Sequence, residues 1–369
     1  MTTNQIYGLV NSIAAQSTGH SGIVAVDDST LVALGNTVLS SSTNTEDFLN
    51  TLVQRIGRTI MDYRAYRNKL QDMVIDDFEY GKILQKIKVK MPEAIADPSY
   101  GLTDGVSVDP WIVHKPDVVQ KLFVQRTPYM FAQSISRQNL KEAFLSARAM
   151  DAFISAVMGE MRNAMELSLE NLGFLTLDNF IAESASREIA LVTEYNSLAS
   201  ASLTAADALL SKDFLAYAIR RVNETFDAMQ YMSENFNDGS VARFTPREDI
   251  RVKLISPFVR AAETVVQYAA FNEELIRVDN TYLKLAYWQA ADDPYKISIK
   301  PASDNSSTVT IDNIIGVVHD REALGLYQIE EEANTTPLNP AGRYYTTFLH
   351  SSQLWYNDLS MNFKFFTLN

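Results

Sequence analysis

The stretch 136–182 reads SRQNLKEAFLSARAMDAFISAVMGEMRNAMELSLENLGFLTLDNFIA. It predicts one long helical element, because apolar residues recur along it at helical spacing. These residues are Leu140, Phe144, Ala147, Ile154, Val157, Met161, Met165, Leu169 and Leu172. Ser136 can cap the first segment, and Asp151 lies where a side-chain oxygen would cap a second segment if the helix is broken there.

Nothing in this stretch forces the helix to stop. No proline occurs between Pro128 and Pro246, so no backbone N–H is missing from the helical ladder. Gly159 and Gly173 each weaken a helix by about 1 kcal/mol relative to alanine and are candidate bending points. A helix over 151–182 would be about 45–50 Å long at about 1.5 Å per residue. A helix of that length is more typical of a rod that supports other elements than of a compact enzyme.

The N-terminal residues predict two short helices separated by an extended arm or a flexible tail. Residues 3–16 have the spacing of a short amphipathic helix. Residues 17–45 are rich in Ser, Thr and Gly and indicate an extended arm with brief strands, or else a flexible tail. Residues 46–57 form a helix with acidic residues at its start and Gly57 as its stop.

Residues 59–133 predict a long two-stranded ribbon. Residues 83–90 alternate, with Ile83, Ile87 and Val89 on one face and lysines on the other. Five of the eleven prolines lie between 92 and 128, and residues 118–124 return as a second strand. An isolated ribbon of this size is marginally stable. It needs a surface to lie on, which a neighbouring copy of the chain can supply.

The rest of the chain mixes helices with short, mostly antiparallel strands, which predicts the α+β class. Helices are expected over 204–236 and within 258–276. Strands are expected over 251–255, 295–300, 309–311, 314–318, 323–327, 344–350 and 361–367.

Composition narrows the functional classes. A chain of 369 residues is expected to form two or more lobes. It has no cysteine, which excludes disulfides, thiol catalysis and cysteine-bound metals. Its net charge of −13 argues against tight, non-specific binding to nucleic acid. The sequence contains neither a signal-peptide pattern nor an apolar run of about 18 residues, so we expect a protein folded in a cytoplasm.

No stretch predicts a catalytic, cofactor or metal site. The phosphate-binding, dinucleotide-binding, nucleophile-elbow and zinc-protease motifs are all absent. The four histidines are far apart, at His20, His114, His319 and His350, and each is expected to be structural or solvated. The acidic doublets at 27–28, 76–77 and 292–293 are expected to be solvated loop charge, and so is 330–332. Eight aromatic residues between 344 and 366 are expected in a core or a subunit interface. These observations together favour an assembly protein rather than an enzyme.

The order of these parts resembles the major capsid proteins of tailed phages with the Hong Kong 97-type fold, and most closely those of small podoviruses of the phi-29 type. Short matches spread over nearly the whole chain carry the resemblance. They are residues 7–16, 47–49, 52–57, 116–118, 121–123, 140–144, 153–155, 317–321, 339–342 and 350. Some relatives carry a further C-terminal immunoglobulin-like domain, which we expect to be absent here because the sequence ends at Asn369.

The resemblance implies a layout of five segments. Residues 1–58 would be the N-terminal arm and first helix, and 59–135 the extended loop with its flanking peripheral-domain strands. Residues 136–186 would be the spine helix of the peripheral domain, 187–310 the axial domain, and 311–369 the C-terminal strands of the peripheral domain. In this layout Ile83, Ile87, Val89, Tyr100 and Trp111 would contact a neighbouring subunit.

The resemblance also implies a function. The chain would assemble with itself into pentamers and hexamers of an icosahedral shell around double-stranded DNA, which it would not bind sequence-specifically. A scaffolding protein during assembly and a portal protein at one vertex would be partners, no membrane or cofactor would be needed, and shells would assemble in the host cytoplasm. Two alternatives stay open here: a nanocompartment shell of the same fold, and an α+β enzyme with a carboxylate site.

Overall fold

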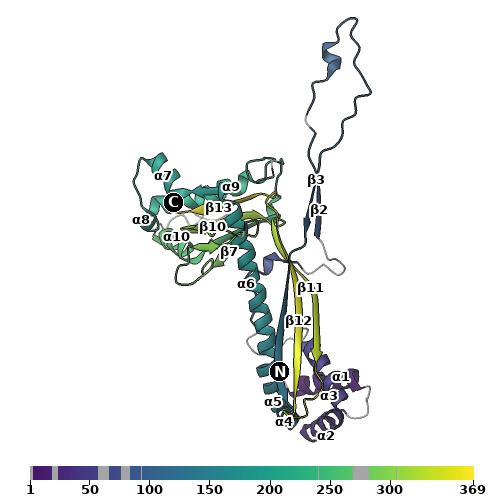
Figure 1. Cartoon of the computed structure of the whole chain (residues 1–369). Helices are drawn as coiled ribbons and strands as arrows, with labels where there is room; N and C mark the ends of the chain where they lie inside the picture. Colours follow the sequence, from purple (N-terminus) through teal and green to yellow (C-terminus); the bar gives the residue numbers. More distant parts are fainter. Residues whose placement is uncertain are drawn as a thin grey trace. The chain divides into compact units, whose positions relative to one another are not determined.

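The computed structural model describes residues 3–18, 24–56, 66–75, 84–92, 94–239, 241–268, 282–304 and 306–369. The chain forms two compact units, each built from separate stretches of sequence (Figure 1). Unit 1 comprises Met1–Gly81, Gln125–Gly173 and Leu326–Trp355, and unit 2 comprises Lys82–Val124, Phe174–Gly325 and Tyr356–Asn369. Both units contain helices and strands, which confirms the α+β class.

Unit 1 opens with three helices, α1 (Thr3–Thr18), α2 (Asp28–Val38) and α3 (Ser42–Ile56). Their apolar sides meet in one core, because burying these faces removes apolar surface from water. Later segments of the same unit complete this core. Its fully buried members include Val10, Leu31, Phe48, Met150 and Ile154.

Helix α2 shows that the expected extended arm over 17–45 was wrong for residues 28–38. Asp27 begins this helix with a capping box: its carboxylate accepts from the Thr30 N–H at 2.8 Å, and the Thr30 hydroxyl accepts from the Asp27 N–H at 3.0 Å. Leu31, Leu34 and Val38 lie at helical spacing and are buried. A strand would have divided these apolar residues between two faces.

The predicted long helix is interrupted earlier than we expected. It consists of α4 (Arg137–Ala143), α5 (Ala147–Phe153), a π-helical turn η3 (Ile154–Gly159) and α6 (Glu160–Glu183). The Ser136 hydroxyl caps α4, as predicted, by accepting from the Asn139 N–H at 3.0 Å. The second cap is Ser146 rather than Asp151, because Ser146 has an extended backbone and its hydroxyl accepts from the Ala149 N–H at 3.2 Å.

The sheet of unit 1 has the strand order β1-β11-β12-β4. Its strands are β1 (Val74–Ile75), β11 (Leu324–Thr335), β12 (Tyr344–Asn357) and β4 (Arg126–Ser136). Strands β12 and β4 pair antiparallel along nearly their whole length, from Tyr344 opposite Ser136 to Leu354 opposite Arg126. Among the described residues outside the ribbon, short 3-10 turns occur at η1 (Gln71–Met73), η4 (Ala185–Arg187) and η5 (Arg247–Asp249).

Unit 2 is built on a sheet of order β5-β13-β10-β6-β7. These strands are β5 (Glu188–Ala190), β13 (Phe363–Thr367), β10 (Ile314–Asp320), β6 (Ile250–Ile255) and β7 (Tyr282–Leu285). Every residue of the central strand β10 is buried, as expected where helices cover a sheet. A hairpin of β8 (Ile297–Ile299) and β9 (Val309–Ile311) belongs to the same unit.

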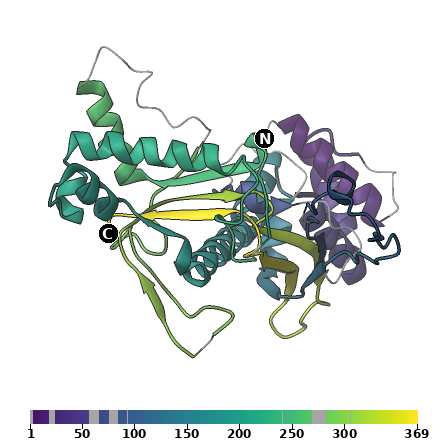
Figure 2. The ribbon, with the colours of Figure 1, turned by 90° about the horizontal axis from the view of Figure 1, so that it is seen from above.

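Four helices accompany this sheet: α7 (Leu191–Ala199), α8 (Ala205–Ala208), α9 (Lys212–Ala228) and α10 (Ser256–Tyr268). Helix α9 packs on β10, and α10 packs on β6. Figure 2 shows α9 lying along the sheet. The expected single helix over 204–236 is therefore α8 and α9, separated by a turn in which the Ser211 hydroxyl caps α9.

The C-terminal strands do not all join one sheet. Strands β10 and β13 belong to the sheet of unit 2, whereas β11 and β12 pair with β4 and β1 in unit 1. The resemblance implied that residues 311–369 all belong to the peripheral domain, and in the structure their strands divide between the two sheets. Pairing between strands distant in sequence decides which sheet each one joins, and single-strand patterns carry no such information.

The predicted ribbon is present in unit 2 as β2 (Leu84–Val89) and β3 (Val118–Phe123), which pair antiparallel. Residues 90–117 connect the two strands and contain only a short 3-10 turn, η2 (Pro98–Gly101), within their described part. Figure 1 shows the two strands leading into this long loop. We call residues 90–117 the tip.

Candidate assembly interface

The two faces of the ribbon strand β2 differ in an unusual way. Its lysine face is turned toward the rest of unit 2, and its apolar face is turned to solvent. The side chains of Lys86 and Lys88 are only 15% and 14% exposed, whereas Ile87 and Val89 are 61% and 59% exposed. The strand therefore presents its apolar residues outward.

Strand β3 extends the same outward apolar face. Val118 lies opposite Val89 in the antiparallel register, and Leu122 lies further along the same face, opposite Gln85. The side chains of Val118 and Leu122 are both more than half exposed. Inward, Phe123 is buried against the ring of Tyr356, with ring centroids 5.3 Å apart. We call Ile87, Val89, Val118 and Leu122 the outer ribbon face.

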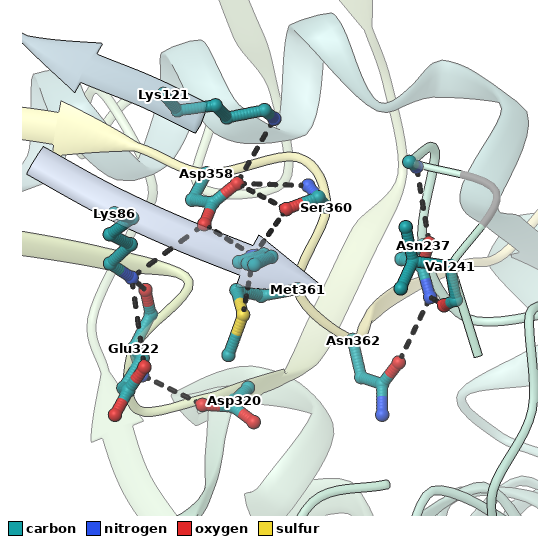
Figure 3. A network of polar contacts seen from close by, with 12 residues as sticks. Lys86, Lys121, Asn237, Val241, Asp320, Glu322, Asp358, Ser360, Met361 and Asn362 are labelled. Carbon is teal, nitrogen blue, oxygen red and sulfur yellow. Dashed lines mark hydrogen bonds and ion pairs between the residues drawn. The ribbon is translucent and has the colours of Figure 1, made fainter. Parts of the chain in front are cut away.

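The inward face is held by one carboxylate (Figure 3). Asp358 is completely buried, and it accepts from the ammonium groups of Lys88 at 2.9 Å and Lys121 at 3.1 Å. Lys86 forms a longer ion pair with it at 3.7 Å. The backbone N–H and the hydroxyl of Ser360 also donate to Asp358, at 3.2 and 2.6 Å. We call Asp358 and the three lysines the lysine hub.

The carboxylate of the hub offsets a repulsion between lysines that the ribbon register creates. Lys86 and Lys121 are direct partners across the two strands, and like charges in such positions repel. Burial alone would raise the pKa of Asp358, but hydrogen bonds from Ser360 and Lys88 and the charges of Lys88 and Lys121 lower this pKa well below its usual range. Asp358 is therefore ionised at neutral pH, and lysines of both strands share its charge.

Lys86 has further partners that fix its position. Its ammonium donates to the carbonyl oxygen of Glu322 at 2.6 Å and lies 4.8 Å from the ring centroid of Tyr356. Burial lowers the pKa of Lys86, and the charge of Asp358 partly offsets that effect. The ribbon base is thus attached to unit 2 through buried, mutually paired charges.

The tip has little core of its own. Tyr100 is 93% exposed and Trp111 is 84% exposed. Other apolar side chains of the tip are also exposed: Ile95, Leu102, Val106, Val108, Ile112 and Val113. An exposed apolar set of this kind marks an interaction surface.

Local contacts nevertheless give the tip a shape. The carboxylates of Asp97 and Asp109 accept from the backbone N–H groups two residues later, each at 2.9 Å. Gly105 takes a positive φ of 79°, which glycine adopts without strain. Lys90 and Asp117 form an exposed ion pair of 2.7 Å where the tip joins the strands.

The structure places the predicted contact residues as follows. Ile87, Val89, Tyr100 and Trp111 are all exposed on the ribbon or its tip, and Ile83 lies outside the described residues. Their contact with a neighbouring subunit stays a prediction. The hub residues were missed, although alternate lysines in a strand were visible in the sequence. Their acceptor is separated from Lys88 by 270 positions, so no local pattern connects them.

The histidines considered as candidate catalytic or metal-binding residues are buried with hydrogen-bond partners or exposed, where the structure describes them. His319 is buried, and its Nδ1 donates to the carbonyl oxygen of Asp320 at 2.8 Å, so its Nε2 accepts from the buried Lys253 ammonium at 2.9 Å. His114 and His350 are exposed, and His20 lies outside the described residues.

Where the structure describes the acidic doublets, their carboxylates either accept hydrogen bonds within the chain or are exposed. Asp27 caps α2, and backbone and side-chain hydrogen bonds from Thr30 lower its pKa to about 2. Asp28 accepts from the Tyr7 hydroxyl and from the Ala147 N–H. The doublet at 292–293 is exposed, and 76–77 lies outside the described residues. Within the described ranges no three or more acidic or histidine side chains cluster as metal ligands would.

Most of the C-terminal aromatic set is core. Tyr345, Tyr356, Phe363, Phe365 and Phe366 are all buried, which confirms the expectation of a core role for these five. Phe363 meets Phe180 edge to face, with ring centroids 4.5 Å apart. No described helix combines the length and apolarity that a membrane span requires.

Comparisons with known proteins agree with these observations. The model of the family described as Phi29-like phage major capsid protein matches residues 10–367. The major capsid protein of Bacillus phage GA-1 is 25% identical over 251 residues, which is 67% of this chain and 49% of that protein. The chain thus spans about half the length of this curated relative. The resemblance seen in the sequence is confirmed.

Solved structures share the fold at low sequence identity. A chain of the capsid structure of Staphylococcus phage Andhra matches with a TM-score of 0.53 and 10% identity, covering 84% of this chain and 87% of that one. A chain from the structure of the head fiber and inner core protein gp22 of native bacteriophage P68 matches with a TM-score of 0.50, 10% identity and the same coverage. These matches support the predicted Hong Kong 97-like capsid fold.

Proposed function

The chain belongs to the family of Phi29-like phage major capsid proteins, and on that basis we propose that it is the repeating subunit of an icosahedral shell built from pentamers and hexamers. The observation that supports this role most directly is the ribbon. Its inward lysines are paired within the chain, while its outer ribbon face and the apolar side chains of the tip are uncovered. In this proposal both surfaces are covered by an adjacent subunit.

The energetics of the ribbon fit such a role. Burying one large apolar side chain contributes about 1.5–3 kcal/mol. Covering the four residues of the outer ribbon face together with Tyr100 and Trp111 would contribute on the order of 10 kcal/mol before the costs of association. Many such contacts of moderate strength close a shell without requiring one very tight interface.

The two units correspond, in this proposal, to the two domains of the capsid subunit. Unit 2, with its sheet, α7 to α10 and the ribbon, contains the whole of the expected axial domain 187–310. Unit 1, with the sheet that includes β11 and β12, contains most of the peripheral domain. Helix α6 contributes residues to both units, which suits the expected role of 136–186 as a spine.

The acidic composition fits a container for DNA. A wall with a net charge of −13 per chain repels the phosphate backbone weakly, whereas a basic wall would adsorb DNA and impede its packing. We therefore propose that the genome is enclosed without sequence-specific contacts. A scaffolding protein, a portal at one vertex, assembly in the host cytoplasm and the absence of catalysis belong to the same proposal.

Deleting part of the tip tests the proposal. A variant that lacks residues 98–110 is expected to stay folded, because these residues are exposed in the chain. It is expected to form no closed shells when expressed with the assembly partners encoded nearby. Electron microscopy of particles and the far-ultraviolet circular dichroism of the unassembled chain give the two readouts.

A matched variant separates loop length from side-chain contacts. It replaces 98–110 with a Gly/Ser segment of the same length and is expected to fail in the same way, because the apolar contacts are missing. Closed shells of normal size from either variant would contradict the assigned role of the ribbon.

A further inference from the structure

A groove lies between helices α7 and α9, in a part of unit 2 distant in sequence from the ribbon. Its volume is about 390 Å³. Tyr195 and Leu198 line it from α7, and Ala216 and Tyr217 line it from α9. No residue of the lysine hub or the outer ribbon face takes part, so the features already described do not account for it.

The floor of the groove is fixed by contacts beneath it. The Tyr195 ring packs on Phe214 and Tyr217, with ring centroids 5.6 and 5.5 Å apart. The Tyr217 hydroxyl donates to the Glu194 carboxylate at 3.0 Å, and the Arg221 Nε donates to the same carboxylate at 2.9 Å. An aromatic floor held in this way is pre-formed and needs little reorganisation to bind a partner.

The rim of the groove carries opposite charges, one of which, Arg220, also forms an exposed ion pair of 3.3 Å with Glu224 and lies over the Tyr217 ring. Asp213 and Arg220 both line it and lie seven positions apart on α9. At 1.5 Å per residue they are about 10 Å apart along the helix axis. An occupant that matches this rim needs an apolar group between a cation and an anion.

The turn between α8 and α9 carries such a group. Leu210 is 84% exposed at this turn. Asp207 precedes it and Lys212 follows it, so the order anion, leucine, cation complements the order Arg220, apolar floor, Asp213. A single exposed leucine needs no explanation by itself. The reciprocal charge order is what points to another copy of this same surface.

We propose that Leu210 of one subunit inserts into the α7–α9 groove of the next subunit, with Lys212 facing Asp213 and Asp207 facing Arg220 across the contact. In the proposed contact one copy supplies only the leucine and the next copy supplies only the groove, which makes the contact heterologous. A heterologous contact forms a ring when its rotation closes, as in pentamers and hexamers. This inference rests on the proposed shell function. It adds to that function a specific contact within pentamers and hexamers.

The absence of cysteine in the chain allows a clean cross-linking test. L210C and A216C are made as separate single variants, each is checked for shell formation, and the two chains are co-assembled in equal amounts. Mild oxidation of the mixed particles is expected to give a disulfide-linked pair that contains one chain of each kind. Neither variant alone is expected to form a linked pair.

The double variant L210C/A216C sharpens the readout. Because each chain then offers both partners, oxidised particles are expected to give a ladder of linked chains that ends at five and six. Linkage of L210C chains to one another would show a two-fold contact and overturn the inference. Normal shells without any mixed disulfide would also overturn it, while leaving the proposed shell function intact. If the unaltered chain forms no shells with its assembly partners, both proposals fail.

A charge exchange supplies an independent check. K212D places two acidic residues against each other across the contact and is expected to lower the yield of shells by about tenfold or more. D213K is expected to do the same with two lysines. K212D/D213K restores the opposite pairing and is expected to recover the yield. Urea unfolding of the unassembled single variants controls for changes in α9 itself, and a double variant no better than the singles would contradict the contact.

Discussion

Replacing Asp358 with asparagine should release the ribbon from unit 2 without changing the size of the side chain. The structure places three lysine ammonium groups within 3.7 Å of this buried carboxylate. In Asp358→Asn, two of these lysines keep their buried positions but lose their counter-ion. The oxygen of the asparagine can still accept from Ser360, so the turn that follows β12 keeps one of its hydrogen bonds.

The size of the effect follows from the burial of each partner. Breaking a buried ion pair by removing one partner costs about 3–5 kcal/mol. Lys121 is 35% exposed and can turn toward water, so the loss of its ion pair adds little to this free-energy cost. Burial already disfavours the charged forms of Lys86 and Lys88 and lowers their pKa, so movement of these two ammonium groups toward solvent relieves part of the remaining cost. We therefore expect a loss of about 2–3 kcal/mol, most of it local to the ribbon.

Hydrogen exchange of the unassembled chain measures this loss directly. At about 1.4 kcal/mol per factor of ten, protection of the β2 and β3 amides should fall about 30- to 100-fold. The amides of β10, which belong to the sheet of unit 2, should keep their protection. Shell assembly should weaken together with ribbon protection, because a detached ribbon must be ordered again at each contact.

The effect should not depend on pH over the ordinary range. The pKa of Asp358 is lowered in the folded chain, so its contribution is fully present above the unfolded pKa of about 3.9 and is lost only as the pH falls through the folded value. The difference between the wild-type chain and the variant should therefore stay constant from pH 5 to 8 and shrink below pH 4.

Asp117→Asn is the matched control. Asp117 also pairs with a lysine of the ribbon, Lys90 at 2.7 Å, but both side chains are well exposed. Loss of such a surface pair costs about 1 kcal/mol or less, so ribbon protection should change less than tenfold. Equal effects of the two substitutions, or unchanged β2 and β3 protection in Asp358→Asn, would refute the reasoning about the hub.

Three further predictions concern other parts of the chain. Burial raises the pKa of Asp178 well above its usual value, so folding requires this carboxyl to take up a proton and stability falls as the pH rises above about 4. Asp178→Asn should remove that dependence and be the more stable protein at pH 7, and a constant difference between pH 4 and 7 in urea unfolding would count against this. A Cβ at Gly316 would overlap a side-chain carbon of Leu254, so Gly316→Ala should cost about 1–3 kcal/mol in thermal unfolding, and an unchanged midpoint would show that β6 and β10 adapt. Tyr100→Ser with Trp111→Ser should leave the urea midpoint unchanged and abolish closed shells, and normal particles in electron micrographs would contradict the role of the tip.

Local patterns in the sequence predicted much of this fold because local forces fix it. The alternation in 83–90 predicted the first ribbon strand, residues 118–124 were expected to return as the second strand, and Ser136 predicted the start of α4. The region 28–38 was predicted wrongly because its Ser, Thr and Gly content was given more weight than the spacing of Leu31, Leu34 and Val38. The capping box at Asp27 was present in the sequence and identifies the helix.

Features fixed by contacts between distant segments were not predictable in this way. Strands β10 to β13 follow one another closely, yet they divide between two sheets. The hub requires Asp358 to meet two strands whose sequences end more than 230 positions earlier. The α7–α9 groove likewise depends on Tyr195 meeting Tyr217 across two helices. A single sequence records none of these distances, so they need the structure.

The orientation of the ribbon has a physical meaning that its sequence alone does not convey. A strand with alternating apolar and charged residues normally buries the apolar ones, and a shift of one residue would turn Ile87 and Val89 inward. Here the buried carboxylate of Asp358 fixes the opposite choice, because only the lysine face can satisfy it. The isolated chain thereby leaves in water apolar side chains worth about 1.5–3 kcal/mol each. That arrangement is favourable in the assembled state if a neighbouring subunit covers those residues. The buried charges then set the register of the ribbon within one chain, and the apolar face is left to stabilise the contact with the next.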